Sequence, residues 1–348
     1  MESGLSKVSP PSARLAVRVR KDSTHTALAE IITRGLLDRD RKVLVKDGFA
    51  EIPIRDSFPG YQIVSQEKPE FYRRTHLLPD ILRESMGSEE LDLLPKGWYI
   101  LGDLIIVRIH PRLDALKHLI AQTLLSIYPR CKAVLRDFGI EGQLRIPVRE
   151  VLVGDVTVTV HRENGVFFRL DASRIMFSQG NLKERMRMSH VGKDEFVVDM
   201  FAGIGYFCLP MSKHSQPSRV LAIELNPLAY HFLRENIRLN RVDDVVEPVL
   251  GDCAQCAPVN EADRVIMGMV QVTDRYLVKG IEALRSGGIL HYHQTIPSWL
   301  YPQAAVSDVV KAANALGWQA EILKCTKVKK YSPGVVHVVV DALIRKGC

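Results

Sequence analysis

The chain has 348 residues, enough for about two or three domains, and 46% of them are hydrophobic, which can supply a sizeable core. No apolar run approaches the ~20 residues of a membrane span, the N-terminus lacks the hydrophobic core of a signal peptide, and six cysteines do not indicate a disulfide framework. We therefore expect a cytoplasmic protein without membrane association. The net charge of +7 favours a polyanionic partner such as a nucleic acid, although many soluble proteins are mildly basic.

Residues 1–60 are predicted to form a small αβ module. Ser23 can cap a helix that runs to Leu36. Apolar stretches separated by turn residues indicate strands over 15–19, 42–45 and 49–54. Residues 61–95 are charged and carry several prolines, and they are predicted to be a connector with some helix near 77–86.

Residues 96–191 are predicted to form an α+β unit. Periodicity indicates strands over 101–109, 151–161 and 166–170, and a helix over 113–127. Glu163-Asn164-Gly165 is typical of the tight turn of a β-hairpin, so the last two strands are expected to pair.

Residues 192–348 alternate between strand and helix, which predicts an open, doubly wound α/β domain. Strands are expected over 196–200, 219–224, 245–250, 264–269 and 288–293, and helices over 228–240 and 304–316. Two further strands, over 320–328 and 335–345, are expected to close the sheet as an antiparallel pair.

A candidate nucleoside site follows the first strand of this domain. The apolar run ends at Asp199, and Gly203 and Gly205 then let the backbone turn tightly beside a ligand. Glu224 ends the next strand, where its carboxylate could accept both hydroxyls of a ribose. Taken alone, Asp199 would be read as an ordinary strand-end carboxylate.

The third strand adds a second contact to this site. Asp252 could accept the amino group of an adenine, while the backbone N–H of Cys253 faces a ring nitrogen. A dinucleotide fold would carry a third glycine, but Gly203-Ile-Gly205 is followed by Tyr206 and Phe207. The pattern therefore favours S-adenosylmethionine over a pyrophosphate, and a dehydrogenase is the weakest alternative.

The segment 199–240 resembles the class I S-adenosylmethionine-dependent transferases, and more narrowly the tRNA enzymes that act at position 37. The motifs that carry this resemblance are Asp-Met-Phe-Ala-Gly-Ile-Gly-Tyr-Phe, Asn-Pro-Leu-Ala and Glu-Asn-Ile-Arg-Leu-Asn. The resemblance implies an α/β fold: a Rossmann-like transferase domain preceded by an α+β domain and a small N-terminal αβ module. The first module is similar to the N-terminal domain of archaeal tRNA methyltransferases, which implies an archaeal source and a tRNA contact away from the anticodon.

Two families share these motifs, the tRNA guanine-37 N1-methyltransferases and the wybutosine-synthesising aminocarboxypropyltransferases. The methyltransferases carry an Asn-Pro-Pro type motif after the fourth strand, where this chain has Met267-Gly268-Met269-Val270. The loop over 176–185 and the segment 287–294 are also similar to the aminocarboxypropyltransferases. The resemblance thus implies transfer of the 3-amino-3-carboxypropyl group of S-adenosylmethionine to carbon 7 of 4-demethylwyosine in tRNA(Phe), with release of methylthioadenosine.

By the same resemblance, Ser178 and Arg185 would contact the methionine end of the donor, with the Arg185 fork suited to its α-carboxylate. Without the resemblance they would be read as a helix N-cap and a solvated cation. No residue is singled out as a general base, and no obligate protein partner is expected. The alternatives left open are guanine-37 methylation and a non-catalytic tRNA-binding protein.

Other groups of polar residues give weaker indications of function. Cys253 and Cys256 have CxxC spacing without a second pair, so no metal or redox role is expected. His291 and His293 can share one face of a strand, where packing is expected rather than a metal, and His293 is the better candidate to face the substrate. Basic residues that could meet tRNA phosphates are Arg14, Arg18, Arg20, Lys21, Lys183, Arg185, Arg187, Lys324, Lys327, Lys329 and Lys330.

Overall fold

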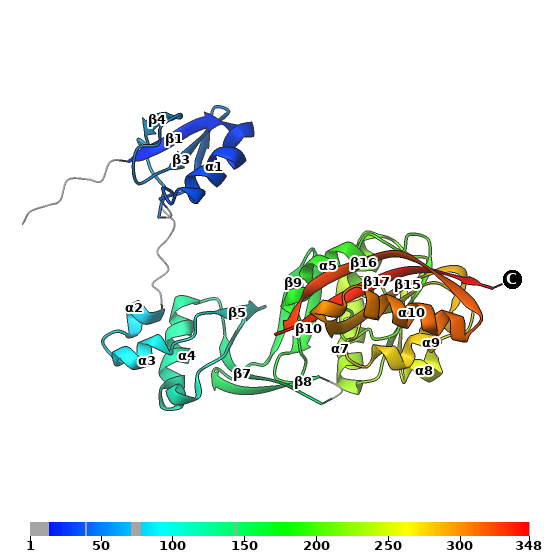
Figure 1. Cartoon of the computed structure of the whole chain (residues 1–348). Coiled ribbons are helices and arrows are strands. Elements are labelled where there is room, and N and C mark those ends of the chain that lie inside the picture. Colours follow the sequence, from blue (N-terminus) through cyan, green and yellow to red (C-terminus); the bar gives the residue numbers. More distant parts are fainter. Residues whose placement is uncertain (1–13, 39, 71–77, 143–144, 348) are drawn as a thin grey trace, which may run out of the picture. The chain divides into compact units, whose positions relative to one another are not determined.

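A small antiparallel sheet forms the first described part of the chain, and one helix packs on it. The computed structural model describes residues 14–38, 40–70, 78–142 and 145–347, and it divides into two units, Met1–Ile81 and Leu82–Cys348 (Figure 1). The first sheet has the order β2-β3-β1-β4. Its elements are β1 (Leu15–Arg20), α1 (Thr24–Thr33), β2 (Leu44–Lys46), β3 (Phe49–Pro53) and β4 (Gln62–Ser65). The connector predicted after residue 60 thus begins with a strand, which pairs with β1.

The second unit begins with a four-stranded sheet of order β5-β6-β7-β8. The short helix α2 (Leu78–Leu82) spans the boundary between the two units. The elements that follow are α3 (Ser88–Asp92), β5 (Trp98–Leu101), β6 (Leu104–Val107), α4 (Lys117–Ile127), β7 (Ala133–Glu141) and β8 (Ile146–Val153). Short 3₁₀ helices in the chain are η1 (Lys21–Ser23), η2 (Pro111–Leu116), η3 (Gln179–Asn181), η4 (Thr273–Tyr276) and η5 (Ser298–Leu300).

Two strands predicted in this region have other bounds in the structure, for the same reason. The strand expected over 101–109 is β6, which begins only at Leu104 because Gly102 turns the chain at φ +61° between β5 and β6. The single strand expected over 151–161 is wrong, because Gly154 ends β8 at φ +81° and a separate strand, β9 (Val158–Glu163), follows. Positive φ is a conformation that glycine adopts without steric cost, and apolar alternation along the sequence does not reveal it.

A separate hairpin, β9 (Val158–Glu163) and β10 (Val166–Asp171), turns at Asn164-Gly165 as predicted. Asn236 accepts the N–H of Arg169 and donates to its carbonyl oxygen, at 2.6 and 3.1 Å. Asn240 makes the same two contacts with Phe167, at 2.9 and 2.7 Å. Both asparagines lie on α7 (Pro227–Asn240), so hydrogen bonds fasten the hairpin to the C-terminal α/β domain.

The remaining strands form a seven-stranded sheet of order β13-β12-β11-β14-β15-β17-β16. Neighbours are parallel except β17, which is antiparallel to β15 and β16 and confirms the predicted closing pair. The strands are β11 (Phe196–Asp199), β12 (Arg219–Glu224), β13 (Val246–Leu250), β14 (Ala262–Met267), β15 (Leu284–Pro297), β16 (Trp318–Ser332) and β17 (Val335–Lys346). The helices are α5 (Leu182–Met188), α6 (Cys208–His214), α7 (Pro227–Asn240), α8 (Cys253–Cys256), α9 (Leu277–Ala283) and α10 (Gln303–Ala315).

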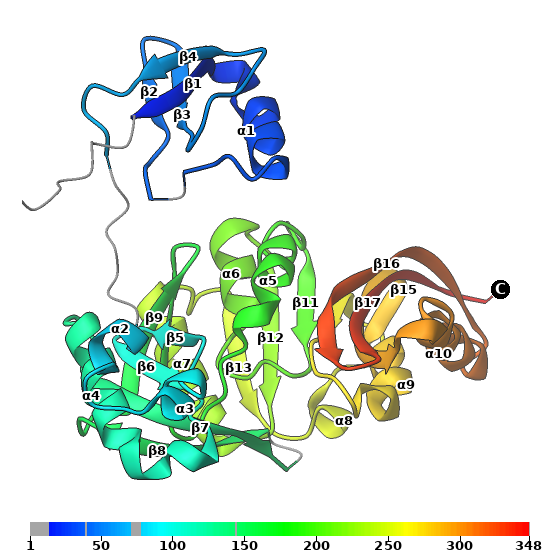
Figure 2. The ribbon, with the colours of Figure 1, turned by 60° about the vertical axis from the view of Figure 1, so that its left-hand side comes forward.

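Both faces of this sheet are buried, as expected of a doubly wound domain. Val197 of β11 packs with α6 and α7, while the next residue, Val198, packs with α9 and α10. Figure 2 shows α9 and α10 beside the β15–β17 end of the sheet. The helices on the two faces leave the loops at the carboxyl ends of β11 to β14 uncovered. Ligands bind at these strand ends in doubly wound folds.

Candidate active site

A cavity of about 500 Å³ opens at the carboxyl ends of the parallel strands. Six of the eight residues predicted for the cofactor line it: Ser178, Arg185, Gly203, Glu224, Asp252 and Cys253. Asp199 and Gly205 are the two that do not line it. The predicted nucleoside end of the cavity lies at Glu224 and Asp252, and the predicted methionine end at Ser178 and Arg185.

Glu224 is held rigidly at the end of β12. One carboxylate oxygen accepts the N–H of Gly203 and the other accepts the N–H of Asn226, each at 2.7 Å. Burial raises the pKa of Glu224, and the two backbone hydrogen bonds act against that rise. A carboxylate oxygen can accept more than one hydrogen bond, so both oxygens keep capacity for the two hydroxyls of a ribose.

Asp199 is fully buried below the glycine turn. Its Oδ1 accepts the N–H of Phe201 at 3.3 Å, whereas its Oδ2 has no partner among the described residues. Burial raises the pKa of Asp199 to about 7, and the nearby charge of Glu224 adds to the effect. Because Phe201 lines the cavity, Asp199 acts on the site by holding this turn of the backbone.

The two glycines keep the turn open. Gly203 and Gly205 have φ of +58° and +103°, which disfavours any side chain there. A Cβ on Gly203 would lie 2.6 Å from the ring of Tyr206, and one on Gly205 would lie 2.3 Å from Leu209. The turn predicted from the two glycines is therefore sterically required.

Asp252 sits at the N-cap of α8, where it accepts the N–H of Ala254 at 2.9 Å. Cys253, the first residue of that helix, is buried, and burial raises the pKa of its thiol. Cys253 and Cys256 are both free thiols. This end of the cavity thus presents a carboxylate above an apolar floor, an arrangement suited to an adenine.

At the opposite end, Arg185 is buried and already engaged. Its Nε and Nη2 donate to the two oxygens of Glu163, and its Nη1 donates to the carbonyl of Ser178, all at 2.7 Å. Direct pairing of Arg185 with the donor's α-carboxylate stays a prediction. The Ser178 side chain makes no cap hydrogen bond, so the simple N-cap interpretation does not apply.

Lys329 of β16 is a second cation at this end. Its Nζ donates to Ser178 Oγ at 3.1 Å, and burial lowers the pKa of Lys329, with Arg145 and Arg185 acting in the same direction. In the described part of the chain Lys329 has no carboxylate partner. Sequence reasoning grouped it only with other basic residues.

Two more lining residues escaped sequence reasoning. Arg145 follows β7 and donates to the hydroxyl of Tyr331 at 3.1 Å, and His337 comes from β17. No local motif marks either residue. The expectation that His293 faces the substrate is wrong: its side chain is fully buried, and it bonds to His337, which lines the cavity in its place.

In the described ranges, no group of three or more His, Cys, Asp or Glu side chains could hold a metal ion. The same residues include no helix that is long and apolar enough to cross a membrane. The fold, the acidic residues at the carboxyl ends of the strands and the glycine turn define a class I S-adenosylmethionine-dependent transferase.

Comparison with known proteins narrows this class. The TYW2 N-terminal domain matches residues 78–157, and the TRM5/TYW2 methyltransferase domain matches residues 159–322. The chain is 41% identical to the tRNA(Phe) (4-demethylwyosine(37)-C(7)) aminocarboxypropyltransferase of Pyrococcus horikoshii over 77% of this chain and 96% of the relative. The enzyme of that name from Methanocaldococcus jannaschii is 42% identical over 70% of this chain and 95% of the relative.

Solved structures agree. P. horikoshii TYW2 in complex with MeSAdo superposes with a TM-score of 0.71 at 39% identity, covering 78% of this chain and all of that one. Trm5b from Pyrococcus abyssi gives a TM-score of 0.70 at 29% identity, over 95% of this chain and 99% of that one. The chain belongs to the TRM5/TYW2 family, in its group of wybutosine-synthesising aminocarboxypropyltransferases.

Proposed function

We propose that this enzyme transfers the 3-amino-3-carboxypropyl group of S-adenosylmethionine to carbon 7 of 4-demethylwyosine at position 37 of tRNA(Phe), releasing methylthioadenosine. The observation that carries this is the wall of the cavity after β14. Gly268, Met269 and Val270 line it where guanine-37 methyltransferases carry an asparagine carboxamide followed by proline. A site without that amide cannot hold a protonated ring nitrogen for methylation in the same way.

The chemistry suits such an apolar wall. Carbon 7 belongs to an electron-rich fused ring, so it can attack the γ-carbon of the methionine moiety without prior deprotonation. A carbon–carbon bond forms, the bond between that γ-carbon and sulfur breaks, and methylthioadenosine leaves. The main task of the protein is to present the γ-carbon, and not the methyl group, to the nucleophile.

Each end of the donor would have its own anchor. Glu224 would hold the ribose and Asp252 the adenine, which fixes the sulfonium relative to the cavity floor. Ser178, Arg185 and Lys329 surround the methionine end, where a cation favours the α-carboxylate.

Exposed basic residues would bind the tRNA backbone. Arg174 lines the cavity and is exposed, and Arg20 and Lys21 are exposed in the first unit. We infer that the first unit contacts tRNA away from the anticodon. A cytoplasmic location fits an enzyme that modifies tRNA.

Mass spectrometry of the nucleoside by-product tests the proposed reaction. The full chain is incubated with S-adenosylmethionine and tRNA(Phe) that carries the tricyclic precursor. Methylthioadenosine, with a matching mass gain on the tRNA, is expected. Release of S-adenosylhomocysteine would instead indicate methyl transfer. If neither by-product forms, the chain is a non-catalytic tRNA-binding protein.

A further inference from the structure

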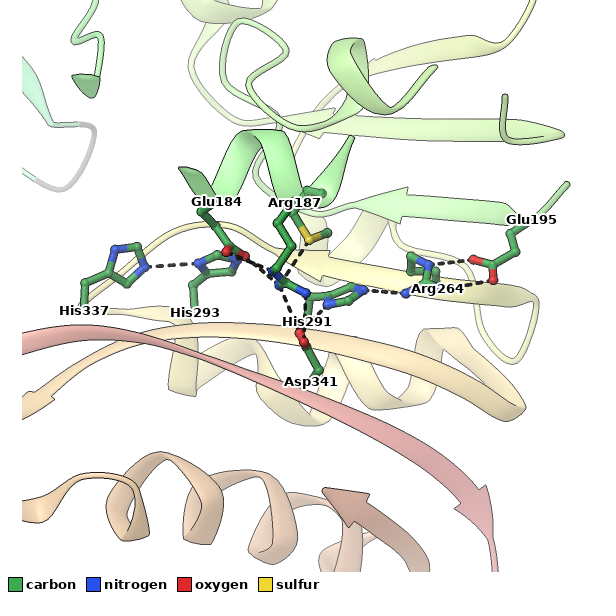
Figure 3. A network of polar contacts seen from close by, with 9 residues as sticks. Glu184, Arg187, Glu195, Arg264, His291, His293, His337 and Asp341 are labelled. Atoms are coloured by element: carbon green, nitrogen blue, oxygen red, sulfur yellow. Dashed lines mark hydrogen bonds and ion pairs between the residues drawn. The ribbon is translucent and has the colours of Figure 1, made fainter. Parts of the chain in front are cut away.

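A row of polar side chains runs from the interior of the domain to the cavity and ends at His337 (Figure 3). His337 Nε2 lies 3.1 Å from Nδ1 of His293. His293 is fully buried, and its Nε2 has no hydrogen-bond partner in the described part of the chain. The nearest acid is Glu184, whose Oε1 lies 3.7 Å from that nitrogen.

Glu184 is fixed in this position by an arginine. Arg187 donates from Nη2 to Oε1 at 2.6 Å and from Nε to Oε2 at 3.0 Å. Arg187 is held in turn by Asp341, at 2.8 and 3.2 Å. Charge-assisted pairs of this kind orient a carboxylate firmly, so Glu184 presents an acceptor oxygen toward His293.

The negative charge of Glu184 favours one tautomer for each histidine, although its Oε1 lies beyond hydrogen-bond distance of His293 Nε2. A neutral imidazole carries one N–H, and on His293 we assign it to Nε2, the nitrogen nearest this carboxylate. His293 Nδ1 is then an acceptor, so His337 must donate its own N–H from Nε2. The remaining nitrogen, His337 Nδ1, therefore carries a lone pair, and no described residue hydrogen-bonds to it.

The reaction needs an acceptor for one proton. When carbon 7 bonds to the γ-carbon of the donor, carbon 7 still carries its hydrogen and the ring system is cationic. Aromaticity returns only when that hydrogen leaves as a proton and its bonding pair returns to the ring. We propose that His337 Nδ1 accepts this proton, as the catalytic residue of the step, while His293 and Glu184 position it. This inference rests on the proposed function.

The surroundings of His337 match this role. Burial lowers the pKa of His337 to about 3, and His293, Lys329 and Arg145 act in the same direction, while Glu184 opposes them. The ring is therefore neutral at pH 7, which keeps its lone pair free and avoids repelling the cationic sulfonium. A weak base is sufficient, because the protonated ring carbon of the intermediate is a very strong acid.

The test replaces His337 with glutamine. The amide nitrogen of H337Q reproduces the Nε2–H donor to His293 but supplies no base, and His231→Gln on the exposed face of α7 is the matched control. We expect H337Q to lose on the order of 10²-fold in kcat, with unchanged affinity for methylthioadenosine by calorimetry. Its deuterium isotope effect with tRNA labelled at carbon 7 should rise above that of the unsubstituted enzyme, because proton loss becomes rate-limiting.

A purely structural role would lower methylthioadenosine affinity or leave the isotope effect unchanged, and either result would overturn the proposal. So would a wild-type kcat in H337Q. Release of S-adenosylhomocysteine by the unsubstituted enzyme would refute the proposed function itself, so the two failures are distinguishable.

Histidine-selective ¹⁵N NMR of the unsubstituted enzyme tests the tautomer even if H337Q does not fold. The histidine whose signals shift when methylthioadenosine binds should carry an unprotonated Nδ1 at neutral pH. A proton on that nitrogen would contradict the relay.

Discussion

At the residue scale, Glu224 and Lys329 lie at the two ends of the proposed donor site. Glu224 is preorganised by backbone N–H groups, whereas Lys329 is a cation that no described carboxylate neutralises. The two side chains should therefore bind different parts of the donor. Methylthioadenosine lacks the aminocarboxypropyl group, so its affinity should depend on Glu224 but not on Lys329.

The substitution Glu224→Gln should weaken methylthioadenosine binding by about 1.5–3 kcal/mol, because hydrogen bonds from the ribose to a charged acceptor are lost. Isothermal titration calorimetry measures the affinity. Glu247→Gln on the neighbouring strand β13 is the control, since that side chain is half-exposed and paired with Arg219. Equal affinities of the two variants would refute the ribose contact.

The substitution Lys329→Met should raise the KM for S-adenosylmethionine about tenfold and leave methylthioadenosine affinity unchanged, because only the former carries an α-carboxylate. Lys330→Met, at the adjacent exposed position, serves as control. If both ligands bind more weakly to K329M, Lys329 supports the cavity wall rather than the carboxylate.

At the element scale, the site depends on segments that reach in from outside the parallel strands. The hairpin β9–β10 brings Glu163 to Arg185, and β16 and β17 carry Lys329 and His337. The hairpin is joined to α7 through buried asparagines, so α7 links the nucleoside end of the cavity to its methionine end.

Replacing Asn236 with alanine should lower the free energy of unfolding by about 2–4 kcal/mol, since the carbonyls of Arg169 and Ile204 and one N–H would lose their partner. Urea unfolding measures this. Arg238→Ala, at an exposed position of the same helix, should have little effect. A similar loss of unfolding free energy in both variants would show that any substitution on α7 destabilises the protein, and that the contact with the hairpin is not the cause.

At the scale of the whole molecule, burial of His293 and His337 couples stability to pH. Burial lowers the pKa of each to about 3, from an ordinary value of 6.5. Above pH 6.5 both rings are neutral in the folded and unfolded chains, and their contribution to stability is complete. Below pH 6.5 the unfolded chain binds protons that the folded chain does not, so stability is lost as pH falls toward 3.

We expect each buried histidine to contribute up to about 1.4 kcal/mol of lost stability per pH unit in this window. Urea unfolding between pH 6.5 and 4.5 should give a shallower pH dependence for the double variant H293Q/H337Q than for the unsubstituted protein. H190Q/H231Q, at exposed positions, is the control and should keep the original slope. The comparison removes contributions of other groups, such as Asp199, whose raised pKa acts in the opposite direction.

The sequence alone determined the doubly wound domain, the closing antiparallel pair and the acidic residues proposed to hold the nucleoside. Asp199 and Glu224 end β11 and β12, and Asp252 follows β13. Such strand ends meet at one edge of a parallel sheet, so the proximity of the three residues follows from local patterns. The domain boundaries at residues 60, 95 and 191 stay predictions.

Only the tertiary structure decided the methionine end and the candidate base. Lys329 and His337 are paired across β16 and β17, whereas Arg145 comes from a segment far away in the chain and reaches the same cavity beside Tyr331. No local motif marks any of the three. Their chemistry also depends on burial, since a lysine or histidine in a sequence carries no sign of how much water its folded position will exclude. His293 shows the same limit. Its position near the end of its strand suggested that it faces the substrate, but its ring is buried and bonded to His337.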